Sequence, residues 1–201
     1  QRLSGEDWQR IAGDPGHPLQ NRAIQAQYTP GSIFKLIVAI AGLESGAITP
    51  DTKFYCPGSF HLGSVKFDCW KKGGHGTQDL HNAIVNSCNV YFYQAGLRSG
   101  IEETVKVARA FGLGEPPGLG LGDEVRGHLP DPQPRRRGQA GWSAGNTLVA
   151  SIGQGPVVTS PMQLLTMVAA IANGGNIYKP YVLRKTTTTN GDVLDEYEPE
   201  L

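Results

Sequence analysis

The sequence predicts an α/β fold in which this chain is mainly helical and carries a few short strands. Helix starts followed by apolar or amphipathic runs recur at 32–44, 101–111 and 159–173. A stretch of turn signals with short apolar pieces, at 47–76, indicates extended segments or loop. Near the end, Asn190-Gly191 stands between two extended runs, which is the strongest short hairpin signal.

Length and composition indicate a folded but loop-rich unit. The 201 residues suit one domain or a large piece of one. Eighteen basic residues balance eighteen acidic ones, which argues against a nucleic-acid binder and against a basic membrane-surface module. The 27 Gly and 14 Pro residues stay below the share of low-complexity chains. The longest apolar run, 33–43, is too short to cross a membrane, and we expect any targeting segment outside this chain.

The first half of the chain contains two expected helices. Residues 1–30 are irregular apart from one helical turn, because prolines interrupt them. A helix is expected over 32–44, with Ser32 as its N-cap and Gly46 just after its end. Another helix should start near 77–79, where capping residue types precede apolar residues at helical spacing.

The second half alternates expected helices with one long loop. Residues 90–111 contain two helical pieces, separated at Gly100. Residues 113–146 are rich in Gly, Pro and Arg, and a loop of that length is uncommon unless it is functional or mobile. The 159–173 segment has Pro at its first helical position, and a hairpin should follow at 181–197.

Lys35 is the only charged residue in the apolar run 33–43. A helix that is apolar on nearly every face is buried, and burial lowers the pKa of an unpaired ammonium. Alternatively, the stem lies along apolar surface and the amine reaches water. Ser32 lies three residues earlier, so both share one helix face. A neutral amine could take the serine proton, whereas the simpler explanation is an N-cap serine with an unrelated lysine.

Ser87-Cys88-Asn89 is a polar triplet between two apolar segments. On a regular helix, Ser87 and Asn89 would point about 200° apart. They can therefore serve one cleft only if the chain leaves helical geometry between them. Taken alone, the triplet is more simply a polar break in a helix–loop–helix.

These segments resemble the motifs of penicillin-binding transpeptidases. The segment 28–35 is similar to their acylation motif, and 87–89 is similar to their second motif, Ser-x-Asn. The flanking segments 21–24, 72–76 and 151–155 add more specific matches. Together with the spacing, they resemble class B enzymes, especially the penicillin-binding protein 2 type of cell elongation.

The resemblance implies the penicillin-binding transpeptidase and β-lactamase-like serine acyltransferase fold. It also implies D,D-transpeptidation of peptidoglycan through a serine acyl-enzyme, which β-lactams would also form. Ser32 would be the nucleophile and Lys35 its base. Ser87 would relay a proton towards the leaving amine. Asn89 would hydrogen-bond the substrate backbone and help hold Lys35. No metal or organic cofactor is implied.

The resemblance also implies partners and a location. The ligands would be peptidoglycan stem peptides and β-lactams, the parent protein would work with a membrane glycan polymerase, and no nucleic acid would take part. The location would be the periplasmic face of the bacterial inner membrane, with an anchor outside this chain. The alternatives are a β-lactam-hydrolysing or β-lactam-sensing relative and a non-catalytic scaffold.

The chain departs from the family pattern at the third motif, Lys-Thr/Ser-Gly. Lys185-Thr186-Thr187 comes nearest, but it lacks Gly and follows 153–155 too early. In the family, that motif lies on a strand that supplies the second oxyanion donor. We therefore expect 1–201 to be a partial transpeptidase domain, with a mobile loop at 113–146, and to be inactive in isolation.

The three cysteines form no Cys-x-x-Cys pair. In a periplasmic domain, a disulfide between Cys56 and Cys69 is the first expectation, and free thiols are the second. A metal site with His61 and His75 comes third, because the spacing matches no common template. Cys88 is expected to be a small buried packing residue.

Two further segments have simple interpretations. The basic run 134–138 is typical of a solvated loop, because three arginines are too few to indicate an anionic surface partner. The glycine-rich run 118–122 is not a phosphate loop, since no Gly-Lys follows it. We expect it to be a flexible turn.

Overall fold

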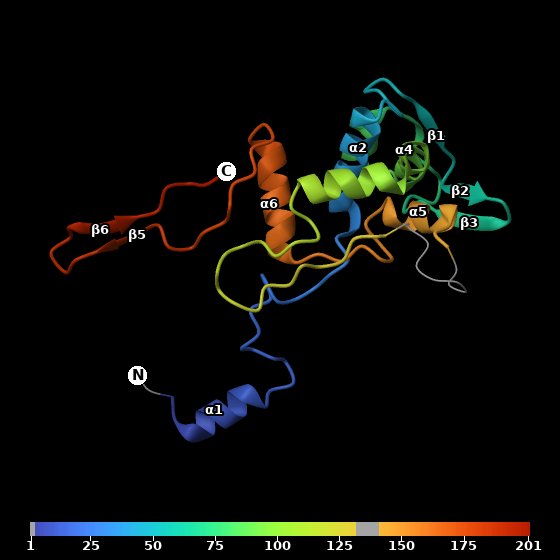
Figure 1. Cartoon of the computed structure of the whole chain (residues 1–201). Helices are drawn as coiled ribbons and strands as arrows, with labels where there is room; N and C mark the ends of the chain where they lie inside the picture. The colour runs from blue at the N-terminus through green and yellow to red at the C-terminus, as the bar shows by residue number, and fades with distance from the viewer. Residues whose placement is uncertain (1–2, 132–140) are drawn as a thin grey trace.

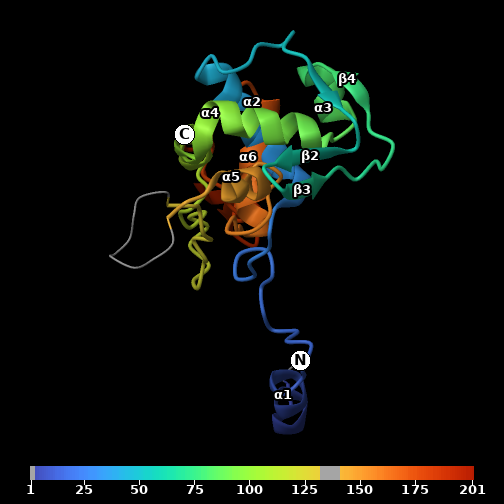
Figure 2. The ribbon, with the colours of Figure 1, turned by 90° about the vertical axis from the view of Figure 1, so that its right-hand side faces the viewer.

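The computed structural model describes residues 3–131 and 141–201. Figure 1 shows a helical body from which two segments project, the N-terminal helix below it and a hairpin to its left. Figure 2, a view turned by 90°, shows that this N-terminal helix lies apart from the body. The basic run at 134–138 lies outside the described residues. Within the described ranges, no helix is long and apolar enough to span a bilayer.

Six α-helices and one 3₁₀ turn lie within the described residues. They are α1 (Gly5–Ala12), η1 (Gly31–Phe34), α2 (Lys35–Glu44), α3 (Leu80–Val85), α4 (Asn89–Ala110), α5 (Ala144–Ala150) and α6 (Pro161–Ala172). The strands form three separate two-stranded antiparallel sheets. These pair β1 (Phe54–Cys56) with β4 (Gly76–Gln78), β2 (Ser59–Leu62) with β3 (Val65–Asp68), and β5 (Lys185–Thr187) with β6 (Val193–Glu196).

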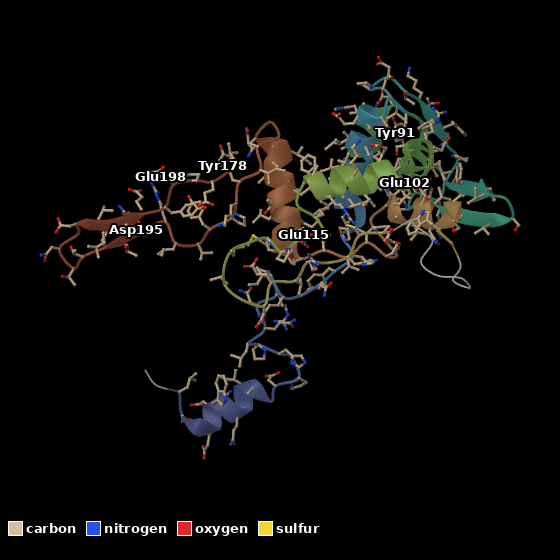
Figure 3. All side chains as sticks on the ribbon, in the orientation of Figure 1. Tyr91, Glu102, Glu115, Tyr178, Asp195 and Glu198 are labelled. Atoms are coloured by element: carbon tan, nitrogen blue, oxygen red, sulfur yellow. The ribbon has the colours of Figure 1, made fainter. Side chains whose placement is uncertain are left out.

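The packing of α2 against α4 forms the centre of the body. Ile37 and Val38 of α2 are completely buried there, as are Tyr91 and Phe92 of α4. Figure 3 shows Tyr91 inside the helical body, with Asp195 far outside it on the hairpin. Fully burying side chains of this size contributes about 1.5–3 kcal/mol each. The same contact encloses the first turn of α2, where the reactive lysine was expected.

Several predicted helix ends are confirmed by their capping geometry. Gly46 has the positive φ of 70° that suits the residue after a helix. Ser160 and Gln163 form a capping box at the start of α6, because each side chain binds the other's backbone amide. The two expected helical pieces form α4, which breaks its helical geometry at Gly100 (φ 81°, ψ 162°). Asp79 caps α3 by accepting a hydrogen bond from the Asn82 amide at 2.8 Å.

The long segment 113–146 differs from the expected loop at one end. Helix α5 begins at Ala144, since Ser143 caps it by accepting from the Asn146 amide at 3.2 Å. Residues 113–131, the described part that precedes this helix, contain no helix and only one isolated β-bridge, between His128 and Val158. The glycine-rich run is organised by Glu124, whose carboxylate accepts hydrogen bonds from the amides of Gly118 (2.6 Å) and Gly120 (2.7 Å).

The predicted hairpin forms, with shorter strands than expected. Every residue of β5 and β6 is exposed. The turn includes Asn190 and Gly191, and Gly191 takes a φ of 94°. Tyr181 and Tyr197 stack beside the strands, with ring centroids 4.1 Å apart. A two-stranded hairpin with no buried face contributes little stability of its own.

Candidate active site

Ser32 lies in the 3₁₀ turn η1, and its side chain is exposed. It is not the N-cap of α2, which corrects the expectation: the turn starts after Pro30 and has no side-chain cap. The turn is held from the other side by Gly153, whose carbonyl accepts the Gly31 amide at 2.8 Å. A Cβ on Gly153 would lie 2.1 Å from the Gly31 oxygen, so this close approach needs glycine.

Lys35 is the first residue of α2, and only 3% of it is exposed. Its amine donates three hydrogen bonds: to the Ser87 carbonyl (2.8 Å), the Ser87 hydroxyl (3.0 Å) and the Asn89 Oδ1 (2.7 Å). The Phe92 ring centroid lies 5.7 Å from Nζ. The sequence left open whether the Lys35 amine is buried or reaches water, and the structure shows that it is buried. The amine meets its acceptors inside the protein.

Burial lowers the pKa of Lys35 to about 8, while the neighbouring thiols of Cys69 and Cys88 act in the opposite direction. Desolvation disfavours the ammonium because the interior cannot replace the water around the charge. A neutral amine is therefore accessible near neutral pH. That is the form able to accept a proton from a hydroxyl.

Ser87 takes a left-handed conformation, with φ 47°. Helix α3 ends at Val85 and α4 begins at Asn89, so the chain leaves helical geometry between them. A non-glycine residue in this region costs about 1 kcal/mol. The break lets Ser87 and Asn89 face the same amine, as a shared cleft requires.

A continuous line of hydrogen bonds joins the expected nucleophile to the buried amine. The Ser87 Oγ donates to the Ser32 Oγ at 3.0 Å and accepts from the Lys35 Nζ at 3.0 Å. The resemblance implied that Lys35 acts on Ser32, and in this geometry the link passes through Ser87. Because hydroxyl protons can rotate, the same line can carry a proton from Ser32 towards a neutral Lys35.

A second cluster lies directly behind the Ser87–Asn89 triplet. One donor atom from each of Cys56, Cys69, His75 and Cys88 lies within 4.8 Å of the other three. The His75 Nδ1 is 3.6 Å from the Cys56 sulfur and 3.5 Å from the Cys69 sulfur. Within the described residues all three cysteines are free, so the expected Cys56–Cys69 disulfide is wrong. Each sulfur faces His75 and the other thiols as part of a four-membered group.

The fold explains why sequence spacing did not reveal this cluster. Its members come from β1, the segment after β3, the approach to β4 and the loop before α4. Gly74, with φ 75°, passes so close to the Cys56 carbonyl that a Cβ would lie 2.2 Å from its oxygen. His61, the other histidine considered, is not a member. Cys88 is completely buried as expected, but it belongs to a polar group rather than to packing alone.

Three sulfurs and one imidazole nitrogen are a donor set that Zn²⁺ prefers in tetrahedral structural sites. Burial lowers the pKa of His75, and the positive charges of Lys71 and Lys35 lower it further. The lowered pKa favours the neutral ring that metal ligation needs. Burial alone would raise the pKa of the Cys69 thiol. Hydrogen bonds from backbone amides, of which the Lys71 amide has the largest effect, outweigh burial and lower this pKa. Burial raises the pKa of Cys88 to about 12, which a bound cation would reverse.

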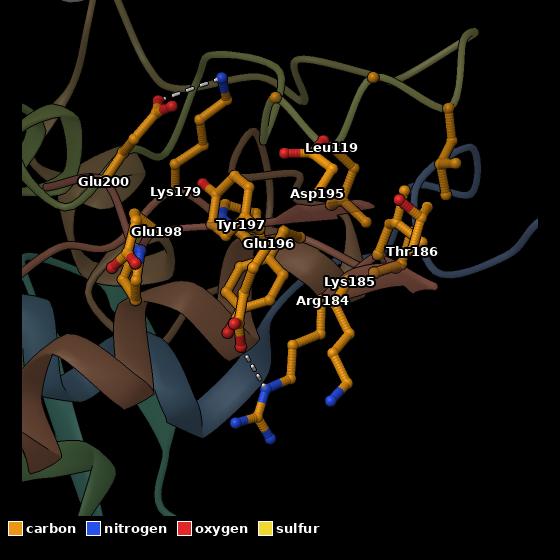
Figure 4. Close-up of a pocket in the computed structure, with 18 residues that line it drawn as sticks. Leu119, Lys179, Arg184, Lys185, Thr186, Asp195, Glu196, Tyr197, Glu198 and Glu200 are labelled. Carbon is orange, nitrogen blue, oxygen red and sulfur yellow. Dashed lines mark hydrogen bonds and ion pairs between the residues drawn. The ribbon is translucent and has the colours of Figure 1, made fainter. Parts of the chain in front are cut away.

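The described part of the chain also contains a cavity that the expected site residues do not line. About 690 Å³ of space lies between the hairpin and the glycine-rich run (Figure 4). Ion pairs on its walls join Lys179 to Glu200 (3.4 Å) and Arg184 to Glu196 (3.9 Å), and all four side chains are about half exposed or more. None of Ser32, Lys35, Ser87 and Asn89 lines this cavity, so it is separate from the candidate active site.

The helical body and its serine–lysine arrangement agree with the penicillin-binding transpeptidase family that the sequence motifs resemble. The family model described as the penicillin binding protein transpeptidase domain matches residues 3–199, so the chain belongs to this family. The match confirms the family predicted from the motifs. It also confirms the fold class, since the described residues form the mainly helical part of such a domain with a few short strands.

Particular relatives agree with this assignment. The peptidoglycan D,D-transpeptidase MrdA of Acinetobacter baumannii is 38% identical over 187 residues, covering 92% of this chain and 28% of that protein. A penicillin-binding protein A–ceftriaxone acyl-enzyme complex from Mycobacterium tuberculosis has a TM-score of 0.83 and 29% identity, over 97% of this chain and 43% of that one. A chain of a peptidoglycan synthase complex has a TM-score of 0.84 and 33% identity, and the match covers 100% of this chain and 33% of that one. The chain therefore spans less than half of the length of these relatives.

Proposed function

We propose that the protein containing this chain is a peptidoglycan D,D-transpeptidase that works through an acyl-enzyme on Ser32. The observation that carries the proposal is the hydrogen-bonded line from the exposed Ser32 hydroxyl through Ser87 to the buried Lys35 amine. An exposed nucleophile beside a desolvated base suits attack on a carbonyl from solvent. Membership of the transpeptidase family supports the same reaction.

In the proposed reaction, neutral Lys35 receives the Ser32 proton by way of Ser87. The Ser32 oxygen attacks the carbonyl between two D-alanines of a stem peptide. The bond to the terminal D-alanine breaks, and Ser87 returns the proton to the leaving amine. An amine from a neighbouring stem then attacks the acyl carbon, the bond to the Ser32 oxygen breaks, and the proton lost by the amine returns to that oxygen. Asn89 holds the Lys35 amine through Oδ1, while its Nδ2 donates to the Asp68 carbonyl at 3.3 Å.

The proposal treats residues 1–201 as a partial domain. The Ser32 amide can supply one oxyanion donor, and the strand with the third motif would supply the other in the parent protein. Losing one such donor typically costs about 10²–10³ in rate. We therefore propose that the chain alone is inactive, although it carries nucleophile and base.

The proposed partners and location follow the relatives. A similar structure belongs to a complex described as coordinating polymerization and crosslinking, which supports a membrane glycan polymerase as a partner here. A penicillin-binding protein A structure is described as a ceftriaxone acyl-enzyme, which supports β-lactams as ligands. We propose the periplasmic face of the inner membrane as the location, with the anchor outside this chain.

Labelling the full-length protein with a fluorescent penicillin tests the function. We expect one stable adduct per molecule, located on Ser32 by intact mass and peptide mapping, and none in Ser32→Ala. The exposed Ser64, in the turn between β2 and β3, provides the control Ser64→Ala, which should label normally. Rapid release of the label would favour a hydrolase, and no adduct would favour a scaffold. Persistent labelling of Ser32→Ala would contradict the assignment.

We also propose that Cys56, Cys69, His75 and Cys88 hold one zinc ion. The supporting observation is the mutual approach of all four donor atoms within 4.8 Å, inside a mostly buried pocket of the fold. Cys88 stands between Ser87 and Asn89, so ligation at its sulfur would fix the backbone of both neighbours. The ion's role in this proposal is structural, since four protein ligands leave no open position.

A further inference from the structure

Trp70 is an exposed aromatic residue whose indole N–H reaches the loop 86–88 between α3 and α4 (the catalytic loop). Although 62% of it is exposed, its indole Nε1 donates to the carbonyls of Asn86 (3.0 Å) and Ser87 (3.2 Å). A single exposed ring needs no explanation, but an indole N–H that binds protein acceptors is a specific contact. Here the partner is the backbone that carries the expected proton relay.

The Ser87 carbonyl oxygen is shared between two donors. It accepts from the Trp70 Nε1 and also from the Lys35 Nζ at 2.8 Å. A carbonyl oxygen has two lone pairs, so both bonds can form together. The orientation of the Ser87 carbonyl therefore determines whether the Lys35 amine keeps one of its three hydrogen bonds.

Ser87 needs such support because its backbone is strained, with φ 47°. Strained conformations persist where the surroundings over-determine them. Two covalently linked carbonyls, those of Asn86 and Ser87, are held by the single N–H of Trp70. If that donor is lost, the loop can relax, and the Ser87 hydroxyl then leaves the line between Ser32 and Lys35.

The other end of Trp70 rests on the Cys/His cluster. Its ring meets the His75 ring edge-on, with centroids 5.1 Å apart and planes at 64°. Trp70 also directly follows Cys69 in the chain. The indole is thus fixed at its base by the cluster and at its tip by the catalytic loop.

We propose that Trp70 is a positioning residue of the transpeptidase reaction: its indole N–H holds the Ser87 carbonyl, and through it the Ser87 hydroxyl and the Lys35 amine. Trp70 acts through Ser87 and does not touch the reacting atoms. This inference rests on the proposed function, since it concerns the rate of Ser32 acylation.

The test compares variants that remove the N–H but keep a ring. Trp70→Phe and a Trp70 variant carrying β-(3-benzothienyl)alanine, which replaces the N–H by sulfur, are prepared in the full-length protein. Trp8→Phe is the matched control, because Trp8 is 53% exposed on the remote helix α1. Stopped-flow acylation by a reporter β-lactam separates the dissociation constant of the first complex from the rate constant of acylation.

For both Trp70 variants we expect the acylation rate constant to fall about tenfold, with the dissociation constant of the first complex unchanged. The adduct should still form on Ser32, and Trp8→Phe should match the unmodified protein. Acylation within twofold of normal in the benzothienyl variant would overturn the inference. A change in the dissociation constant alone would also overturn it, because the ring would then be a ligand contact. If the unmodified protein forms no adduct, the proposed function fails, and this inference fails with it.

Discussion

Two short segments combine a lysine with hydroxyl residues, 32–35 and 185–187, and the structure gives them opposite surroundings. Lys35 is 3% exposed, and its amine has three acceptors inside the helical body. The segment 185–187 lies on the exposed hairpin, which Figure 1 places far to the left of α2. The difference teaches that the reactivity of a lysine depends on desolvation and on partners, and not on the residues beside it in sequence.

The packing of each segment explains the contrast. Helix α2 packs against α4, and most of its residues, including Lys35 at its start, are buried. The hairpin pairs β5 only with β6, and neither strand has a buried residue. Lys185 on this strand is exposed to water, in contrast to the buried Lys35.

The largest effect is expected for Lys35→Met, which keeps the apolar stem and removes the amine. Acylation of the full-length protein should fall at least about 10²-fold, the low end for general-base catalysis. Thermal stability should change little, because removing a costly buried charge offsets the loss of the three hydrogen bonds that the amine donates. Acylation kinetics and a melting curve on the same sample check both statements. A variant that unfolds but acylates normally while folded would show that Lys35 is structural.

The next effect concerns pH, since burial lowers the pKa of Lys35 from 10.5 to about 8. Below pH 8 the amine is mostly protonated, so the acylation rate should fall about tenfold for each pH unit. Above pH 8 the rate should level off. Between pH 8 and 10.5 this lysine binds more protons in the unfolded chain than in the folded one. The contribution of Lys35 to the free energy of unfolding should therefore rise with pH over this range. A rate that is flat from pH 6 to 9 would contradict the role of Lys35 as base.

Local signals in the sequence were sufficient for much of the fold. The capping box of Ser160 and Gln163, the break at Gly100 and the turn at Asn190-Gly191 each depend on a few neighbouring residues. Such features form from short-range hydrogen bonds and backbone preferences, which sequence reasoning can evaluate. Ser32, Lys35, Ser87 and Asn89 were predicted as site residues from sequence, and the structure places their side chains in one hydrogen-bonded group.

Long-range features were not accessible from sequence. The Cys/His cluster combines one residue of a strand with three from separate connecting segments, so the spacing of its residues in the sequence does not indicate a metal site. Ser32 sits in a 3₁₀ turn rather than at an N-cap, because the contact of Gly31 with Gly153 holds the chain there. The exact link from Ser32 to Lys35 depends on the backbone angle at Ser87, which only the packed structure sets.

A smaller effect is expected when the cluster behind the catalytic loop is broken. Purified protein should contain about one zinc per chain, and Cys56→Ser should lose it. Acylation should then fall about tenfold, the low end for losing support of a metal site, and the melting temperature should fall as well. His61→Ala is the control, since His61 is outside the cluster. Metal analysis that finds no zinc in protein prepared without chelators would contradict the proposal.

The smallest effect is expected for Lys185→Met. Lys185, Thr186 and Thr187 come nearest to the missing third motif, so a substrate-binding role there would make acylation sensitive to this change. Strand β5 is fully exposed, and Figure 1 places it far from α2, the helix that directly follows the η1 turn. We therefore expect the full-length protein to acylate within twofold of normal, measured beside Lys35→Met under the same conditions. A loss of tenfold or more would show that the hairpin reaches the active site in the whole protein, and the contrast between the two lysines would then be wrong.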